Sequence, residues 1–377
     1  MMKRGGVDAV TGESIVVECD SVIQSMDPLI SNESADTYIA AGFIDLQVNG
    51  FAGIDFNSPA VSQEEISRAS NAIFSTGVTR FFPTVITGDP AEMLAALRNL
   101  AAARASLPYG EAMEGFHVEG PHISPEDGPR GAHPREWVRP PDFDEFLRWQ
   151  DAAQGHVRLV TLAPEWPAAG SYIERITETG VVAAIGHTRA TAAQIRDAVS
   201  AGATLSTHLG NGAGSKTRSE EFIAEQLHSS RLAASFIVDQ HHLPAEFLSR
   251  ALHAKGVERC LLVTDAAAPE MGPPGPYVLG GVAVELKEDG RVVLRGGTRL
   301  AGSSLRMDHA MGNVMARAGL TLAEAITMAT TNPARVGRVG GRLRGLQPGS
   351  RADLVRFRLA GGRVEVLETY FSGQRVF

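Results

Sequence analysis

Four polar side chains in this sequence each stand at the end of a short apolar segment of the kind that forms a buried strand. They are Glu119, His187, His208 and Asp265. Side chains at the carboxyl ends of parallel barrel strands meet at one face, so we expect these four to converge there. One carboxylate and two histidines leave a coordination position open for water, which is the pattern of a catalytic rather than a structural zinc site.

This set predicts a metal-dependent hydrolase. We expect Glu119, His187 and His208 to hold one divalent cation, which lowers the pKa of a bound water to about 7. Asp265 would act as a base on that water and return the proton to a leaving group. Zn²⁺ suits two histidines and a carboxylate, and Fe²⁺, Co²⁺ and Mn²⁺ share such ligands.

Each of these residues alone has an ordinary structural explanation. A Glu after a strand is usually a solvated loop residue, and a His followed by Thr, as at His187, often makes a hydrogen bond at a helix entry. Four such residues in chain order at successive strand ends favour the metal site. His117 lies two residues before Glu119, on the same side of the strand and one layer deeper, so we interpret it as a packing residue.

Two other histidine positions are candidates for the same site. His133 lies in the Gly/Pro-rich loop 121–141, and a long loop that follows a barrel strand is expected to cover the active-site mouth. The alternative for a loop histidine is simple solvation. In the pair His241 and His242, we expect one ring to face the pocket and the other to face solvent.

The turn after His208 contains small residues. Asn211 and Gly212 leave backbone N–H groups accessible, which suits an anion or a sugar oxygen. A plain tight turn is the alternative. Lys216 and Arg218 add positive charge close by in the sequence.

The elements that position these residues alternate between strands and helices, which predicts a (β/α)₈ barrel. A doubly wound open sheet is the alternative, but it requires a Gly-rich phosphate loop after the first strand, which Asn49–Gly53 matches poorly. The expected strands are Phe43–Val48, Thr79–Val85, Gly115–Glu119, Arg158–Ala163, Val181–Gly186, Ala203–His208, Ala233–Asp239 and Cys260–Asp265. The clearest expected helices are Ser62–Ser75, Pro90–Arg104, Ala192–Ala201, Glu220–His228 and Pro244–Ala254.

Both chain ends are rich in short β-branched segments with turn formers between them and have no helical period. We therefore expect a small β-sandwich domain built from residues 1–41 and 336–377. The barrel domain would occupy residues 42–335.

The composition is that of an ordinary globular protein, with 44% hydrophobic and 21% charged residues in 377. The net charge of −8 gives no indication of nucleic-acid binding, and no segment approaches transmembrane length. Cys19 and Cys260 are the only cysteines, far apart in apolar segments, and we expect free thiols and a reducing compartment. These features predict a cytoplasmic protein.

The ordered set of motifs resembles the N-acetylglucosamine-6-phosphate deacetylases of the amidohydrolase superfamily, nearly from end to end. The resemblance implies a (β/α)₈ barrel with a small β-sandwich, a homodimer and a divalent metal. The motifs are Gly42–Asp45, His117–Pro121, Ile185–Thr188, Thr207–Asn211, Leu262–Ala266, Ala301–Leu305, Thr331–Ala334 and Gly349–Leu354.

The same resemblance implies roles for individual residues. Glu119, His187 and His208 match the metal ligands, and Asp265 matches the catalytic acid and base. The positions that match substrate contacts are His133 at the acetamide carbonyl, Asn211 and Gly212 near the phosphate, Arg218 reaching a phosphate across a dimer, His242, and Leu305 through its main chain.

Two segments depart from the superfamily pattern. Gln47-Val48-Asn49 replaces the His-x-His that binds a second metal in many amidohydrolases, so we predict one tightly bound metal. The segment Leu209–Gly214 is more open than its counterpart in the family, which affects the predicted phosphate contact.

The sequence therefore predicts deacetylation of N-acetylglucosamine 6-phosphate, a small-molecule substrate, to glucosamine 6-phosphate and acetate. One alternative is an amidohydrolase that acts on an unphosphorylated N-acyl amino sugar or an N-acyl amino acid. Another is a metal-binding barrel without catalysis.

Overall fold

The computed structural model describes residues 2–29, 36–211 and 221–377. Its centre is a sheet of eight parallel strands in the order β14-β13-β12-β11-β10-β9-β8-β5. A parallel bridge between Val48 and Ala266 joins the two edges of this order, so the sheet curls into a nearly closed barrel. The strands are β5 (Phe43–Val48), β8 (Val78–Ile86), β9 (Phe116–Glu119), β10 (Val157–Leu162), β11 (Val182–Ile185), β12 (Leu205–Ser206), β13 (Ala233–Phe236) and β14 (Cys260–Leu262).

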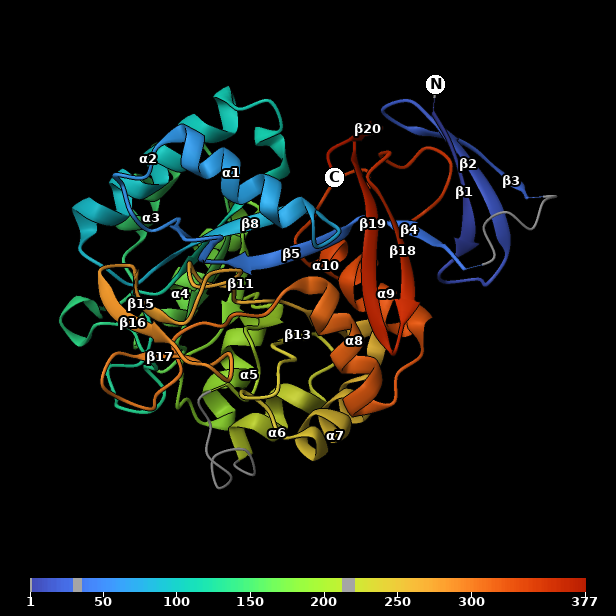
Figure 1. The fold of residues 1–377 in the computed structure, drawn as a ribbon. Helices are drawn as coiled ribbons and strands as arrows, with labels where there is room; N and C mark the ends of the chain where they lie inside the picture. Colours follow the sequence, from blue (N-terminus) through green and yellow to red (C-terminus); the bar gives the residue numbers. More distant parts are fainter. Residues whose placement is uncertain (1, 30–35, 212–220) are drawn as a thin grey trace.

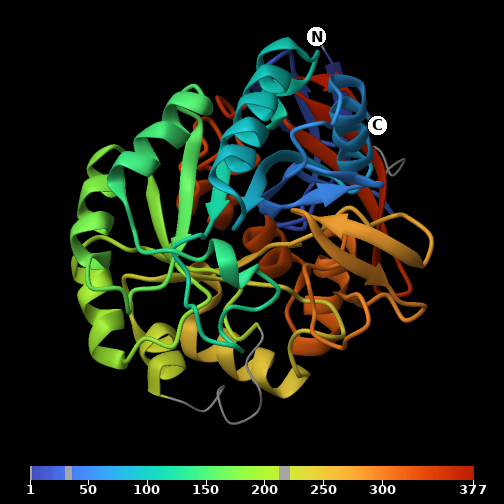
Figure 2. The same cartoon turned by 90° about the vertical axis from the view of Figure 1, so that its left-hand side faces the viewer.

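Helices connect the strands and cover the outside of the barrel (Figure 2). Several begin with the side-chain caps that the sequence offers, such as the capping box of Ser62 and Glu65 on α1. The α-helices are α1 (Gln63–Phe74), α2 (Pro90–Ser106), α3 (Phe143–Ala152), α4 (Ala169–Glu178), α5 (Ala192–Ser200), α6 (Glu221–His228), α7 (Ala245–Lys255), α8 (Met307–Ala318), α9 (Leu322–Ala329) and α10 (Thr331–Val336). Short 3₁₀ turns are η1 (Gly110–Ala112), η2 (Arg135–Trp137) and η4 (Val257–Arg259).

The predicted barrel is thereby confirmed, with one consistent difference at the strand ends. We expected strands as far as His208 and Asp265, but β12 ends at Ser206 and β14 ends at Leu262. The chain leaves the regular strand before the polar residue, which frees that residue to take a different backbone conformation.

The two chain ends form a separate sheet domain beside the barrel, as predicted (Figure 1). Its seven strands pair in the order β20-β19-β18-β4-β1-β2-β3, so β4 joins the N-terminal and C-terminal halves. Ile15, Val17, Ile39 and Leu354 belong to a small core of this domain. The strands are β1 (Met2–Asp8), β2 (Ser14–Cys19), β3 (Ile23–Pro28), β4 (Tyr38–Ala41), β18 (Leu354–Ala360), β19 (Arg363–Phe371) and β20 (Gln374–Arg375).

A three-stranded antiparallel sheet between β14 and α8 was not predicted from the sequence. Its side chains Leu279 and Val284 pack in one cluster with Ile86, at the carboxyl end of β8, so this sheet lies at the mouth of the barrel. Its strands are β15 (Gly275–Leu279), β16 (Val282–Leu286) and β17 (Val292–Leu294). A two-stranded hairpin, β6 (Gly50–Phe51) and β7 (Ile54–Asp55), follows β5.

Two smaller predictions can be compared with this structure. Cys19 and Cys260 are buried free thiols, as expected. Within the described part of the chain, no helix combines the length and the apolar character that a membrane span needs.

Candidate active site

The four predicted strand-end residues meet at the carboxyl end of the barrel. Glu119 is the last residue of β9, whereas His187, His208 and Asp265 lie just beyond β11, β12 and β14. Those three residues have φ values of 49°, 30° and 52°. Left-handed backbone is uncommon outside glycine and clusters at functional sites, where the surrounding structure has to maintain it.

Glu119 is the centre of this cluster. Its Oε1 lies 2.8 Å from His208 Nε2 and 3.3 Å from His187 Nε2. The Glu119 side chain is 3% exposed, so water does not screen these contacts. The structure therefore brings the three predicted metal ligands together.

His133 joins the cluster from the loop between β9 and α3. Its Nε2 lies 3.3 Å from His187 Nε2, and its Nδ1 lies 2.9 Å from Thr87 Oγ1. Glu119, His133 and His187 each offer a ligand atom within 4.8 Å of the others, so these three could also hold a metal. The loop that the sequence placed over the mouth thus brings its histidine to the ligand atoms.

The hydrogen bonds behind His187 fit a cation site. Its Nδ1 lies 2.9 Å from the carbonyl oxygen of Pro129, and a carbonyl oxygen can only accept, so Nδ1 carries the proton. In the neutral ring, Nε2 then presents a lone pair to Glu119 Oε1. Such a partner for the second nitrogen is typical of a metal-binding histidine. Two acceptor atoms face one another at this position, and a cation between them would satisfy both.

The pKa values in the cluster follow from burial and from these contacts. Burial raises the pKa of Glu119, but the contacts with His187 and His208 outweigh it and hold the pKa well below its usual range. Burial opposes a charge on His208, yet Glu119 raises its pKa. Burial lowers the pKa of His133 to about 3, with a further contribution from His187, so His133 is neutral. Metal binding would displace the proton that Glu119 and His208 share.

Asp265 lies beside Glu119 with amide partners instead of a cation. Its Oδ1 accepts hydrogen bonds from Gln47 Nε2 at 3.0 Å and from Asn49 Nδ2 at 2.7 Å. Burial, together with the charge of Glu119, raises the pKa of Asp265 to about 6. A carboxyl group with this pKa can both take and return a proton near neutral pH.

Two cavities adjoin the ligand atoms and share Gly128, Pro129, His187 and Asn211. One, of about 260 Å³, is lined by Asp265 and by apolar side chains from the β15–β17 sheet. The other, of about 230 Å³, extends from His208 to α6.

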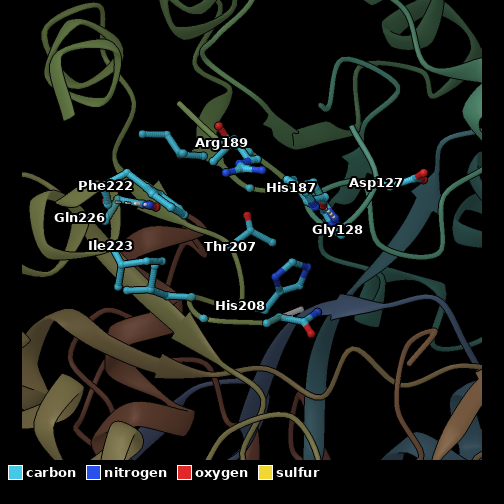
Figure 3. A pocket seen from close by; sticks show the side chains of 16 residues that line it. Asp127, Gly128, His187, Arg189, Thr207, His208, Phe222, Ile223 and Gln226 are labelled. Atoms are coloured by element: carbon cyan, nitrogen blue, oxygen red, sulfur yellow. Dashed lines mark hydrogen bonds between the residues drawn. The ribbon is translucent and has the colours of Figure 1, made fainter. Parts of the chain in front are cut away.

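Figure 3 shows the second cavity in detail. Phe222, Ile223 and Gln226 of α6 lie on the side opposite Gly128. The cluster is thus accessible from two sides, which leaves room for the two parts of a substrate on either side of a scissile bond.

The remaining predicted residues have different surroundings. Asn211 lines both cavities. His242 is buried, and its Nδ1 lies 2.7 Å from Asp239 Oδ2, whereas His241 is partly exposed. Leu305 lines a third hollow, and its N–H donates to Ser303 Oγ.

Some predictions cannot be compared with the structure in this way. Gly212, Lys216 and Arg218 lie outside the described residues. His117 has no exposed surface, and its Nε2 lies 2.7 Å from Thr161 Oγ1, which agrees with a packing role.

Sequence reasoning missed the partners of these residues. Thr87 and Pro129 had no local signal, because their role depends on loops that meet in space. Gln47 and Asn49 were considered only as replacements for the two histidines of the His-x-His motif. Their spacing of two at the end of an expected strand suggested that both side chains face the same way, which was a usable signal.

Comparisons with known proteins agree with this geometry. A family model described as the amidohydrolase family matches residues 38–376. The chain is 30% identical to N-acetylglucosamine-6-phosphate deacetylase of Bacillus subtilis, covering 91% of this chain and 85% of that protein. It is 33% identical to N-acetylgalactosamine-6-phosphate deacetylase of Escherichia coli O157:H7, covering 89% and 88%. The crystal structure of N-acetyl-D-glucosamine-6-phosphate deacetylase from Mycobacterium smegmatis superposes with a TM-score of 0.89 at 29% identity over 100% of both chains. This chain belongs to the amidohydrolase family.

Proposed function

We propose that this protein hydrolyses the acetamide of N-acetylglucosamine 6-phosphate to give glucosamine 6-phosphate and acetate. The observation that carries this proposal is the buried cluster of Glu119, His187 and His208 with Asp265 beside it. The deacetylase names of the relatives support the choice of reaction.

In the proposed mechanism, Glu119, His187 and His208 would hold one divalent cation, and its chemistry would be to lower the pKa of a water in the site. Asp265 takes the proton of the attacking water and then transfers it to the sugar nitrogen as the C–N bond breaks. Its Oδ1 is occupied by two amide donors, so Oδ2 is the oxygen for this task.

His133 is proposed to stabilise the oxyanion that forms on the acetamide carbonyl. If Thr87 donates its hydroxyl proton to Nδ1, the proton of the neutral ring is on Nε2, which points toward the cluster. The low pKa of His133 supports a neutral donor.

We propose that the sugar phosphate is contacted by Asn211, Gly212, His242, Leu305 and Arg218, the last from the neighbouring subunit of a homodimer. Asn211 has the clearest support, because it lines both cavities.

We also propose Zn²⁺ as the metal, which suits the two histidines and the carboxylate. The domain limits at residues 41 and 336 and a cytoplasmic location belong to the same proposal, the latter supported by the two free thiols.

A second candidate substrate is N-acetylgalactosamine 6-phosphate, the epimer at C4. A relative named for this substrate is 33% identical, which is at least as similar as the B. subtilis relative at 30%. The chemistry at the acetamide is the same for both sugars, so contacts remote from the metal must decide between them.

Acetate release by one metal-quantified preparation tests the proposal. N-acetylglucosamine 6-phosphate, its C4 epimer and unphosphorylated N-acetylglucosamine are compared. We expect a kcat/KM preference of at least a hundredfold for a phosphorylated sugar, about 2.7 kcal/mol of transition-state binding. Equal rates with and without phosphate would overturn the proposed phosphate contacts. No release from any of the three substrates by metal-loaded protein would overturn the reaction itself.

A further inference from the structure

Strand β5 and the residue just after its end carry three polar side chains whose contacts all reach the end of β14 or the cluster beside it. Asp45 accepts from Thr264 Oγ1 at 2.6 Å in the barrel interior. Gln47 and Asn49 follow at intervals of two residues, and their side-chain amides donate to Asp265 Oδ1. Alternate residues of a strand share one face, so Asp45 and Gln47 form a polar row along β5, and Asn49 continues it just beyond the end of the strand.

Gln47 makes a contact that the other two residues do not make. Its side-chain nitrogen carries two hydrogens, and it lies 3.0 Å from Glu119 Oε1 and 3.0 Å from Asp265 Oδ1. Both carboxylates can therefore accept from one NH₂ group. Gln47 is 1% exposed, so water cannot replace these bonds without rearrangement of the site.

Asn49 has a narrower role. Its Nδ2 donates to Asp265 Oδ1 at 2.7 Å and to the Asp265 carbonyl oxygen at 3.3 Å, and it has no hydrogen bond to Glu119 among the described residues. The two amides thus occupy the same oxygen of Asp265. No hydrogen bond from the described residues reaches Oδ2, which is left for proton transfer.

We propose that Gln47 is a positioning residue that couples Glu119 to Asp265, and that Asn49 is a positioning residue for Asp265 alone. Two donors on Oδ1 fix the rotation of the Asp265 carboxyl group and turn Oδ2 toward the reacting atoms. The bridge through Gln47 sets the spacing between the carboxylate that holds the metal and the carboxylate that moves the proton.

The chemistry of the carboxamide explains why it fits this position. A primary amide offers two N–H donors on one atom, as a bridge between two carboxylates requires. It carries no charge, so it orients Asp265 without holding it permanently ionised as a buried cation would. A pair of side chains that could have been metal ligands thus takes a supporting role. This inference deepens the proposed function and rests on it for the role of Asp265.

The first test is a titration of the metal-free protein with Zn²⁺ against a competing chelator, which needs no substrate. The Gln47→Met variant keeps the length of the side chain and removes its two N–H donors. We expect its metal Kd to rise about 10–100-fold, the usual effect of losing a partner behind a metal ligand. Asn49→Ala should leave the metal Kd within about twofold of wild type, because Asn49 has no hydrogen bond to Glu119 among the described residues.

A matched control and a second variant separate a specific effect on metal binding from misfolding of a variant. Gln150 is a partly buried glutamine on α3 whose amide donates to Val157 O at 2.9 Å, remote from the cluster. Gln150→Met should change neither the metal Kd nor kcat. Gln47→Leu should reproduce the result of Gln47→Met, because both variants lack the donors.

The second test is a double-mutant cycle on turnover. We expect Gln47→Met to lower kcat about 10²-fold in wild-type protein at saturating metal, with KM changed little. In an Asp265→Asn background the same change should have almost no further effect on kcat, because Gln47 would act through Asp265.

Three results would overturn the proposal. They are additive effects on log kcat in the cycle, an unchanged metal Kd in both Gln47 variants, and equal metal Kd increases in the Gln47 and Asn49 variants. A wild-type protein that binds metal but releases no acetate would count against the proposed function, and the Zn²⁺ titration would still decide whether Gln47 supports Glu119.

Discussion

The two ends of the barrel bury carboxylates in opposite ways. At the amino end, Asp353 lies 2.7 Å from Arg80 Nε and 2.9 Å from Arg342 Nη1 and also accepts from the backbone N–H of Ser372. At the carboxyl end, Glu119 and Asp265 meet imidazoles and amides, and no arginine or lysine of the described residues forms an ion pair with them.

The pKa shifts reflect this difference. Burial raises the pKa of Asp353, but the two guanidinium groups outweigh it and lower the pKa below the ordinary value. Asp265, with neutral partners and Glu119 nearby, has a pKa raised to about 6. At the amino end, the buried carboxylate of Asp353 is neutralised by arginines of the protein itself, and these ion pairs join the barrel to the terminal sheet domain. The carboxyl end has converging acceptors that need a cation, which is the property of a binding site.

The strongest test of this comparison is Asp265→Asn. We expect kcat to fall by about 10²–10⁴-fold, because the amide cannot take the proton of the water. Bound metal, measured by elemental analysis, should stay at the wild-type level, since Asp265 is not one of the proposed ligands. Near wild-type turnover at the same metal content would contradict the proposed role of Asp265 in proton transfer.

At the other end, we expect Asp353→Asn to lower the free energy of unfolding by about 3–5 kcal/mol. Arg342 loses its one carboxylate partner among the described residues, and Arg80 keeps only Glu114, at 3.1 Å. Denaturant unfolding measures this. The control is Glu365→Gln, which breaks the exposed pair with Arg358 at 2.6 Å and should cost no more than about 1 kcal/mol. Equal losses of unfolding free energy in both variants would show that the buried ion pairs stabilise the protein no more than an exposed pair does.

Metal removal should act on the carboxyl end alone. We expect the chelated protein to lose activity and to recover it with Zn²⁺. Saturation at a hundred times the Kd should stabilise the fold by about 2.7 kcal/mol, observed as a higher Tm. In the His187→Asn variant the Tm gain should shrink markedly, whereas in Asp353→Asn it should persist. A Tm that does not respond to metal in wild-type protein would contradict the proposed site.

The smallest expected effect concerns Asp45, between the two ends. Burial raises its pKa to about 7, so its proton contributes stability at low pH, and this contribution is lost as pH rises toward and through 7. Asp45→Asn does not titrate. The stability gap between variant and wild type should therefore narrow by about 2–3 kcal/mol from pH 5 to pH 8. A gap that stayed constant from pH 5 to pH 8 would mean that Asp45 is already ionised in the folded protein at pH 5.

The sequence predicted the barrel because alternation of apolar segments with capped helices is a local pattern. All eight strands were placed to within about three residues at each end, although β12 is only two residues long. The β15–β17 sheet was missed, because its hairpins lie between two barrel elements and carry no periodic signal of their own. His133 was associated with the site through the length of its loop and through the family resemblance.

What the sequence by itself determined is the set of chemical groups. They are one carboxylate and two histidines at strand ends, a second carboxylate at the last strand, and two amides at the end of the first strand. Only the tertiary structure decided how they meet. The left-handed backbone at His187, His208 and Asp265 is maintained by the packing around it. The bridge of Gln47 joins residues 72 and 218 positions away in the chain. Such contacts depend on barrel closure, which brings the first and last strands together, and no local pattern encodes it.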